Sequence, residues 1–202
     1  MVTVYVEGGG HKALDSQLRA AFRKLFTRAG ADVRAIKVVA GGSRETTFDK
    51  FQRACSQGAT AFLLVDSEGP VPAAYQLGDK EAWTPWRYLH QASGDGWATP
   101  GNASETDCHL MVQCMESWFL ACPEALRKYF GQGFNAGALP GSTMNTDDVA
   151  KEKVLQGLKN ATRHCRKHYD KGRDSFKVLE KLEPDAVRNG SGWADRFFKM
   201  LP

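Results

Sequence analysis

The apolar run Ala61-Phe62-Leu63-Leu64-Val65 most strongly constrains what this chain can fold into. It presents no polar residue to either side, which is typical of a central strand in a parallel sheet that is covered by helices on both faces. The run ends on Asp66-Ser67-Glu68-Gly69-Pro70, where glycine and proline prevent continuation of the strand. We therefore expect an α/β fold with a mostly parallel, Rossmann-like sheet flanked by helices.

The first third of the chain alternates between strand and helix patterns. Residues 2–6 and 33–39 are rich in β-branched residues and predict two further strands. Residues 11–29 and 46–57 place apolar side chains at helical spacing and predict two amphipathic helices. The order strand, helix, strand, helix, strand predicts parallel pairing.

The remaining two thirds are less regular. Residues 70–107 predict a long loop, in which Trp83, Trp86 and Trp97 either stack nucleic-acid bases or cover the sheet edge; we favour the second interpretation. We divide the chain into an α/β core over 1–130 and a helical, basic C-terminal region over 131–202 that packs on it. The other expected elements are a strand over 109–112, helices over 113–120, 123–130, 149–169, 174–182 and 191–201, and a mostly irregular linker over 131–148.

Composition favours a folded cytoplasmic protein. The chain has 202 residues, of which 42% are hydrophobic, enough to bury a core. No apolar run approaches the roughly 20 residues that a membrane span needs, and the N-terminus lacks the pattern of a secretory signal. The five cysteines show no C-x-x-C spacing, so we assign them no chemical role.

The net charge of +4 is weak evidence for an acidic partner, but its distribution is uneven. The most basic stretch runs from Lys151 to Lys181. Such a stretch is usually a solvated helix face, although a surface that follows a phosphate backbone is the alternative.

Acidic residues follow two of the predicted strands. Glu7 follows the first strand, and Asp66 and Glu68 follow the third. Because ligands gather at the carboxyl ends of parallel strands, we expect these side chains to converge. Asp66 and Glu68 are two apart, so in an extended segment they point to the same side. Each acid alone is commonly a cap or turn residue.

Three converging carboxylates repel one another unless a cation lies between them. Hard oxygen ligands suit Mg²⁺ or Mn²⁺ better than zinc. The sequence therefore predicts a divalent-metal site at Glu7, Asp66 and Glu68.

This pattern resembles the Toprim domain of topoisomerases, bacterial primases and OLD-family nucleases. The matching residues are Val6-Glu7-Gly8 and Asp66-Ser67-Glu68, and Glu68 departs from the family's usual second aspartate. Nearly the whole chain also resembles a bacterial family of Toprim-like proteins encoded beside AAA-type ATPases in defence loci. That likeness rests on Val6-Glu7-Gly8-Gly9, Leu64-Val65-Asp66-Ser67-Glu68, Leu110-Met111-Val112-Gln113-x-Met115-Glu116-x-Trp118 and Tyr169-x-Lys171-Gly172.

The resemblance implies two further catalytic residues. Glu116 lies among apolar residues of a predicted helix, either exposed at its edge or buried with a partner. The resemblance implies that it is a site residue and a further metal ligand. Lys171, in an expected turn between helices, would stabilise charge on a phosphate, with Lys177 in reserve.

Phosphate contacts are also predicted around two glycine-rich turns. Gly8 and Gly9, followed by Lys12, could place backbone N–H groups and a cation around a phosphate, although a P-loop spacing is absent. Arg44, after the second glycine pair, either binds phosphate or is solvated.

The leading functional expectation is Mg²⁺- or Mn²⁺-dependent hydrolysis of phosphodiester bonds in nucleic acid, by the effector subunit of an ATPase-associated defence system. The first alternative is a non-catalytic regulatory or sensing subunit that docks on an AAA-type ATPase, through an exposed aromatic loop over residues 83–97. The second is phosphoryl or nucleotidyl chemistry on a small nucleotide.

Overall fold

The computed structural model describes residues 1–141 and 145–202. Within them a four-stranded, entirely parallel sheet has the order β2-β1-β3-β4, which confirms the expected α/β fold. Val4 pairs with Val38 on one side and Phe62 on the other, which fixes the register around β1. The strands are β1 (Val2–Val6), β2 (Ile36–Ala40), β3 (Ala61–Asp66) and β4 (Cys108–Met111).

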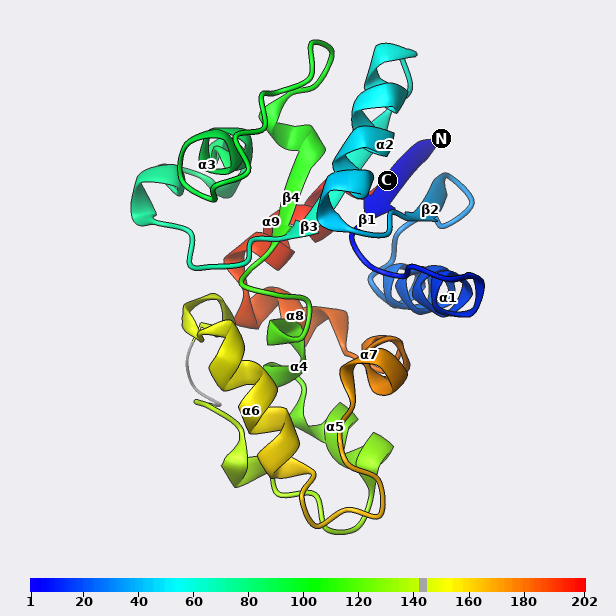
Figure 1. Ribbon diagram of the computed structural model, residues 1–202, viewed down its shortest axis with the longest axis vertical. Helices are drawn as coiled ribbons and strands as arrows, with labels where there is room; N and C mark the ends of the chain where they lie inside the picture. Colours follow the sequence, from blue (N-terminus) through cyan, green and yellow to red (C-terminus); the bar gives the residue numbers. More distant parts are fainter. Residues whose placement is uncertain (142–144) are drawn as a thin grey trace.

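Strand β3 is buried along its whole length because helices cover both faces of the sheet. Phe62 and Leu64 face one core, and Leu63 and Val65 face the other, as the two-residue period of a strand requires. Helices α1 and α9 pack on the first face, and α2 and α3 on the second (Figure 1). Their bounds are Lys12–Arg28 for α1, Arg44–Ser56 for α2, Pro85–Gln91 for α3 and Gly192–Met200 for α9.

The long segment over 70–107 is a folded cover rather than an open loop. Trp83 and Trp86 are buried in the core of the second face, and Trp97 stacks on Phe48 with ring centroids 4.3 Å apart. The tryptophans therefore cover the sheet, as favoured above. The expectation of an exposed aromatic patch for partner docking is wrong, because these rings contribute to the core. The segment contains α3 and three 3₁₀ turns, Ala73–Tyr75, Lys80–Ala82 and Glu105–Asp107.

The C-terminal region forms the lower part of the molecule and then returns to the sheet (Figure 1). Phe197 in α9 packs against Phe26 in α1 with ring centroids 5.7 Å apart, so the chain's end completes the first core. The elements of this region before α9 are α6 (Lys151–Ala161), α7 (Lys171–Leu179) and α8 (Pro184–Gly190), with 3₁₀ turns at Ala136–Ala138 and Thr146–Asp148. The short helices α4 (Ser117–Leu120) and α5 (Pro123–Phe130), which follow β4, lie beside them in the lower part (Figure 1).

Some helix boundaries differ from the expected ones. The helix expected over 149–169 ends at Ala161, and the next begins at Lys171 rather than 174. Asp170 explains the earlier start, because its side chain accepts a hydrogen bond from the Arg173 N–H and so caps the helix. The helix expected over 113–120 is confined to α4. The irregular linker expected over 131–148 contains two 3₁₀ turns, and its residues 142–144 lie outside the described part.

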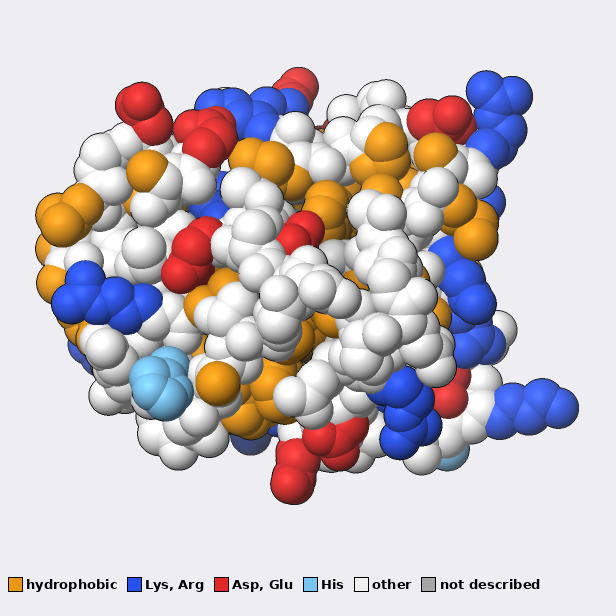
Figure 2. Space-filling model, turned by 90° about the horizontal axis from the view of Figure 1, so that it is seen from above, with side chains coloured by type: hydrophobic (Ala, Val, Ile, Leu, Met, Phe, Trp, Pro, Cys, Tyr) orange, Lys and Arg blue, Asp and Glu red, His pale blue; other side chains and the backbone are white. Residues whose placement is uncertain are grey.

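Across the described residues, no helix is both long and apolar enough to cross a membrane. The end of the molecule seen from above in Figure 2 mixes basic, acidic and apolar side chains. Charge of one sign does not gather on that face.

Candidate metal centre

The predicted acidic residues meet where the order of the strands reverses. The chain passes from β1 outward to β2 and then crosses back to β3 on the opposite side of β1. The carboxyl ends of β1 and β3 therefore border the crevice in which open α/β sheets bind ligands. Glu7 directly follows β1, and Asp66 is the last residue of β3.

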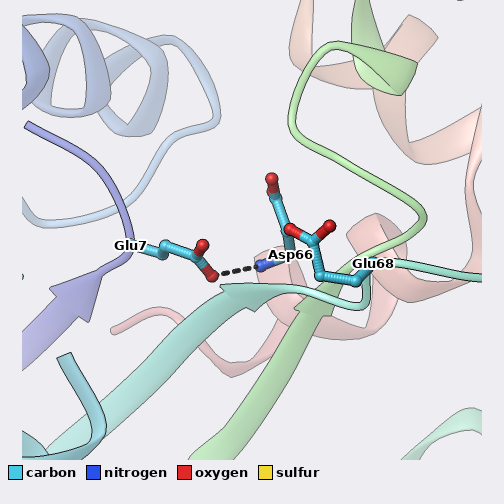
Figure 3. A group of neighbouring side chains, drawn as sticks. All are labelled: Glu7, Asp66 and Glu68. Carbon is cyan, nitrogen blue, oxygen red and sulfur yellow. Dashed lines mark hydrogen bonds between the residues drawn. The ribbon is translucent and has the colours of Figure 1, made fainter. Parts of the chain in front are cut away.

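Glu7, Asp66 and Glu68 each offer a carboxylate oxygen, and these oxygens lie within 4.8 Å of one another (Figure 3). Glu7 is held in place because its Oε2 accepts a hydrogen bond from the Asp66 N–H at 3.1 Å. Asp66 is buried, and its Oδ1 accepts a hydrogen bond from the Met115 N–H at 2.8 Å. Backbone N–H groups of β3 and of the segment after β4 thus orient the cluster.

Glu68 reaches the cluster by a route that differs from the expected extended segment. Its φ is +62°, a left-handed conformation that non-glycine residues adopt rarely. The Glu68 N–H donates to the Gln113 carbonyl at 3.0 Å, which holds this turn. The turn directs the Glu68 carboxylate back toward Asp66 (Figure 3). Backbone strain of this kind clusters at functional sites.

The electrostatics of the cluster favour a cation. Burial raises the pKa of Glu7, and Arg44 offsets part of that effect. Burial, together with the charges of Glu7 and Glu116, raises the pKa of Asp66 well above its usual range. Both carboxylates are therefore costly to ionise as they stand, and a divalent ion would relieve that cost. The all-oxygen donor set fits Mg²⁺ or Mn²⁺.

Basic side chains already contact each end of the site. Arg44 Nη1 lies 3.3 Å from Glu7 Oε2, and the ammonium of Lys151 contacts the Glu68 carboxylate. Lys151 was not predicted as a site residue, because only its place at the start of the basic stretch distinguished it. It is the first residue of α6 and reaches across 83 positions of sequence.

A cavity of about 190 Å³ opens beside the cluster and is lined by two of its acids, Glu7 and Asp66. Glu116 at its wall is wholly buried, which excludes the exposed position considered above. Its Oε2 has no hydrogen-bond partner and lies 3.4 Å from the Lys171 Nζ, which confirms that these two predicted residues lie together. The cavity is lined by Glu7, Gly8, Gly9, Leu14, Asp66, Met115, Glu116, Lys171, Gly172, Ser175 and Phe176.

Two hydroxyl groups that sequence reasoning missed orient Glu116. Its Oε1 accepts hydrogen bonds from the Tyr169 hydroxyl at 3.2 Å and from Ser175 Oγ at 2.9 Å. Burial and the Glu116 charge raise the pKa of Tyr169, which keeps this hydroxyl protonated as a donor. Glu116 does not belong to the cluster within 4.8 Å; it immediately precedes α4 and lines the same cavity. Tyr169 stood in a recognised motif, whereas Ser175 gave no sequence signal.

The predicted phosphate-binding residues are distributed unevenly. Gly8 and Gly9 line the cavity, but the Gly8 N–H already donates to the Gly42 carbonyl at 2.9 Å. Lys12 and Lys177 are exposed, and neither lines the cavity. Either lysine could therefore contact a phosphate only if the ligand extends out of the cavity.

Arg44 was expected either to bind phosphate or to be solvated, and the structure shows a third arrangement. Its Nε and Nη2 bind both oxygens of Asp95 at 2.7 and 2.8 Å, and its guanidinium lies 4.9 Å from the centroid of the Trp97 ring. Its Nη1 contacts Glu7 and the Asp66 carbonyl. Arg44 is thus neither solvated nor free, and it ties the cover segment to the acidic cluster.

Comparison with known proteins gives one match. The family model described as "Domain of unknown function (DUF4276)" matches residues 6–202. No curated protein and no solved structure matches the chain. Because the match spans the acidic cluster, the cavity and the helices around it, the chain belongs to the DUF4276 family.

Proposed function

We propose that this protein hydrolyses phosphodiester bonds of nucleic acid with the help of Mg²⁺ or Mn²⁺. The observation that carries the proposal is the approach of three carboxylates to within 4.8 Å at the strand-order switch. Glu7, Asp66 and Glu68 would hold the ion. When bound, it would supply Lewis-acid stabilisation of the phosphate and a more acidic water.

The residues around the cavity fit this chemistry. Glu116 Oε2 has no hydrogen-bond partner and faces the cavity, so it is placed to accept a proton from an attacking water or to hold a second ion. Lys171 is half-exposed beside it and is placed to neutralise charge that develops on the phosphate. The hydroxyls of Tyr169 and Ser175 act as positioning groups, because they contact Glu116.

The test is cleavage of single-stranded and duplex DNA and RNA by purified protein with Mg²⁺, Mn²⁺ or EDTA. Asp66→Asn keeps the size of the side chain and should lower the rate by at least about 100-fold, because a metal ligand is lost. Asp147→Asn is the matched control, since Asp147 is also a buried acid but lies outside both the cluster and the cavity lining. Equal rates in wild type and Asp66→Asn would refute the proposal.

One observation favours the regulatory alternative. Arg44, Lys151 and Lys171 already pair with acids of the site, so these ion pairs could be a purely structural network. A regulatory subunit that docks on an ATPase would then need no metal. Isothermal titration with Mg²⁺ and Mn²⁺ distinguishes the two, because only the nuclease proposal requires binding that Asp66→Asn abolishes. The proposed role in a defence system rests on the family resemblance and is tested by co-purification with an ATPase encoded nearby.

A further inference from the structure

The cavity beside the acids has an apolar side that metal chemistry does not explain. Leu14 and Phe176 are half-buried and line it together with Met115. Three carboxylates, those of Glu7, Asp66 and Glu116, line the same cavity, so a ligand there would meet both acidic groups and apolar surface. A phosphate alone would not use the apolar part.

The Phe176 ring packs against the protein at its tip and has free space beside it at Gly172. A Cβ placed on Gly8 would lie 3.5 Å from Phe176 Cζ, so the tip of the ring packs against the strand-to-helix turn. Gly172 lies one helical turn before Phe176, where side chains four apart normally meet. Apart from its two chain neighbours and the backbone of its own helix, a Cβ placed on Gly172 would have only Asp170 Oδ1 within 4 Å, at 3.6 Å, so the Phe176 ring does not fill this space. The absent side chain leaves a gap alongside the aromatic ring.

The size of the cavity limits what can enter. Its volume is about 190 Å³. That space suits one flat heterocycle and is below the ~300–1,000 Å³ of pockets for larger ligands.

We propose that this cavity takes a single unpaired nucleobase, stacked on Phe176 in the gap left by Gly172, with the adjoining phosphate directed toward the acids. The proposal rests on the proposed function and narrows its substrate to an unpaired nucleotide. Aromatic rings bind any base through its face, so the cavity would select unpaired bases rather than a sequence. The two sources of such a base are a single strand and a free nucleotide.

The experiment uses 2-aminopurine, a base whose fluorescence falls when it stacks. The full-length protein is titrated, with Ca²⁺ present, into 2-aminopurine ribonucleoside monophosphate, a single-stranded oligonucleotide ending in 2-aminopurine, and the same oligonucleotide in a duplex. We expect quenching with at least one unpaired probe and little with the duplex. The monophosphate and the single strand distinguish the two sources, and quenching with either supports the proposal.

Variants test the assigned surface. Phe176→Leu should weaken binding by on the order of tenfold and lose the quenching, whereas Phe176→Tyr should retain both. Gly172→Ala should fold normally but weaken binding, because its methyl group enters the gap. Phe134→Leu, a buried aromatic position outside the cavity lining, controls for general destabilisation.

Quenching that is equal in wild type and Phe176→Leu, or equal for single strand and duplex, would overturn the proposal. Failure of the proposed function is separate from this result. Quenching without any metal-dependent cleavage would support the base site and refute the nuclease. Cleavage without quenching would support the nuclease and refute the base site.

Discussion

Replacing Asp66 by Asn should stabilise the metal-free protein and remove its response to Mg²⁺. The oxygens of Asp66 and Glu7 lie within 4.8 Å, and one ionised pair at that distance repels by about 3.5 kcal/mol at an effective dielectric constant of about 20. Arg44 and Lys151 offset part of this repulsion. Asn keeps the oxygen that accepts the Met115 N–H bond. We therefore expect a gain of about 1–3 kcal/mol in the free energy of unfolding at neutral pH.

Mg²⁺ should stabilise the wild type and leave the stability of Asp66→Asn unchanged. At a concentration 100 times its Kd, a ligand that binds only the folded state adds about 2.7 kcal/mol to its stability. For a chain of this length that is a rise of about 5–11 °C in Tm. Wild type should show this rise and Asp66→Asn should not. Circular dichroism during thermal and urea denaturation, with EDTA or Mg²⁺, measures both effects.

The stability of the protein should also depend on pH through Asp66. A carboxyl whose pKa is raised in the folded state holds its proton longer there, so its stabilising contribution is complete below the unfolded pKa and declines as pH rises. For Asp66 the decline begins near the ordinary value of 3.8, and it should be absent in Asp66→Asn.

Asp147 is the control for this titration, because burial raises its pKa to about 6 away from the metal cluster. Asp147→Asn should remove a decline of up to about 3 kcal/mol between pH 4 and 6, and it should leave the Mg²⁺ response intact. If Asp66→Asn is less stable than wild type in EDTA at pH 7, or if Mg²⁺ stabilises both equally, the reasoning about the cluster fails.

Three further predictions concern the surrounding structure. Arg196 is wholly buried and donates to the carbonyls of Lys80, Glu105 and Cys108, so Arg196→Met should lower the free energy of unfolding by about 2–4 kcal/mol; an equal effect from the exposed Arg34→Met would contradict this. Arg44→Lys loses the two-pronged contact with Asp95, and hydrogen exchange should then accelerate in residues 93–97 and stay unchanged in β2. The five cysteines are buried, and burial raises the pKa of Cys114 to about 12 and of Cys122 to about 11; a thiol reagent at pH 8 should label five groups only after denaturation, and rapid labelling of native protein would refute this.

The three-acid cluster could be predicted from sequence because a local pattern fixes it. An apolar run such as 61–65 predicts a central parallel strand, and the carboxyl ends of parallel strands meet at one edge of the sheet. This rule predicts that Glu7 and Asp66 lie close together. Glu68 reached the right place for a different reason, since a left-handed turn held by Gln113 directs it, and no residue type in the sequence signals that turn.

The other half of the site depends on contacts that no periodicity encodes. Lys151, Tyr169 and Ser175 reach the acids only because the C-terminal region folds back below the sheet (Figure 1). Their separations from Glu68 and Glu116 are 83, 53 and 59 residues, so packing of the whole chain sets these contacts. A cap such as Asp170 could have predicted where α7 starts, and therefore which of its residues share a face.

The division between these two halves has a functional consequence. The segments after β1 and β3 supply the three-acid cluster, and the segment before α4 supplies Glu116. Helices α6 and α7 supply the lysines that pair with Glu68 and Glu116. Any motion of these helices relative to the sheet would separate cations from acids and change the charge that a metal and a phosphate encounter.

Lys151→Met and Lys171→Met therefore should not be equivalent. The first should tighten Mg²⁺ binding, because it removes a competitor of the ion at Glu68. The second should lower the cleavage rate more than it changes Mg²⁺ affinity, because Lys171 contacts none of the three cluster acids and faces the cavity. Parallel titration calorimetry and single-turnover kinetics would show this, and identical behaviour of the two variants would contradict the assignment of separate roles.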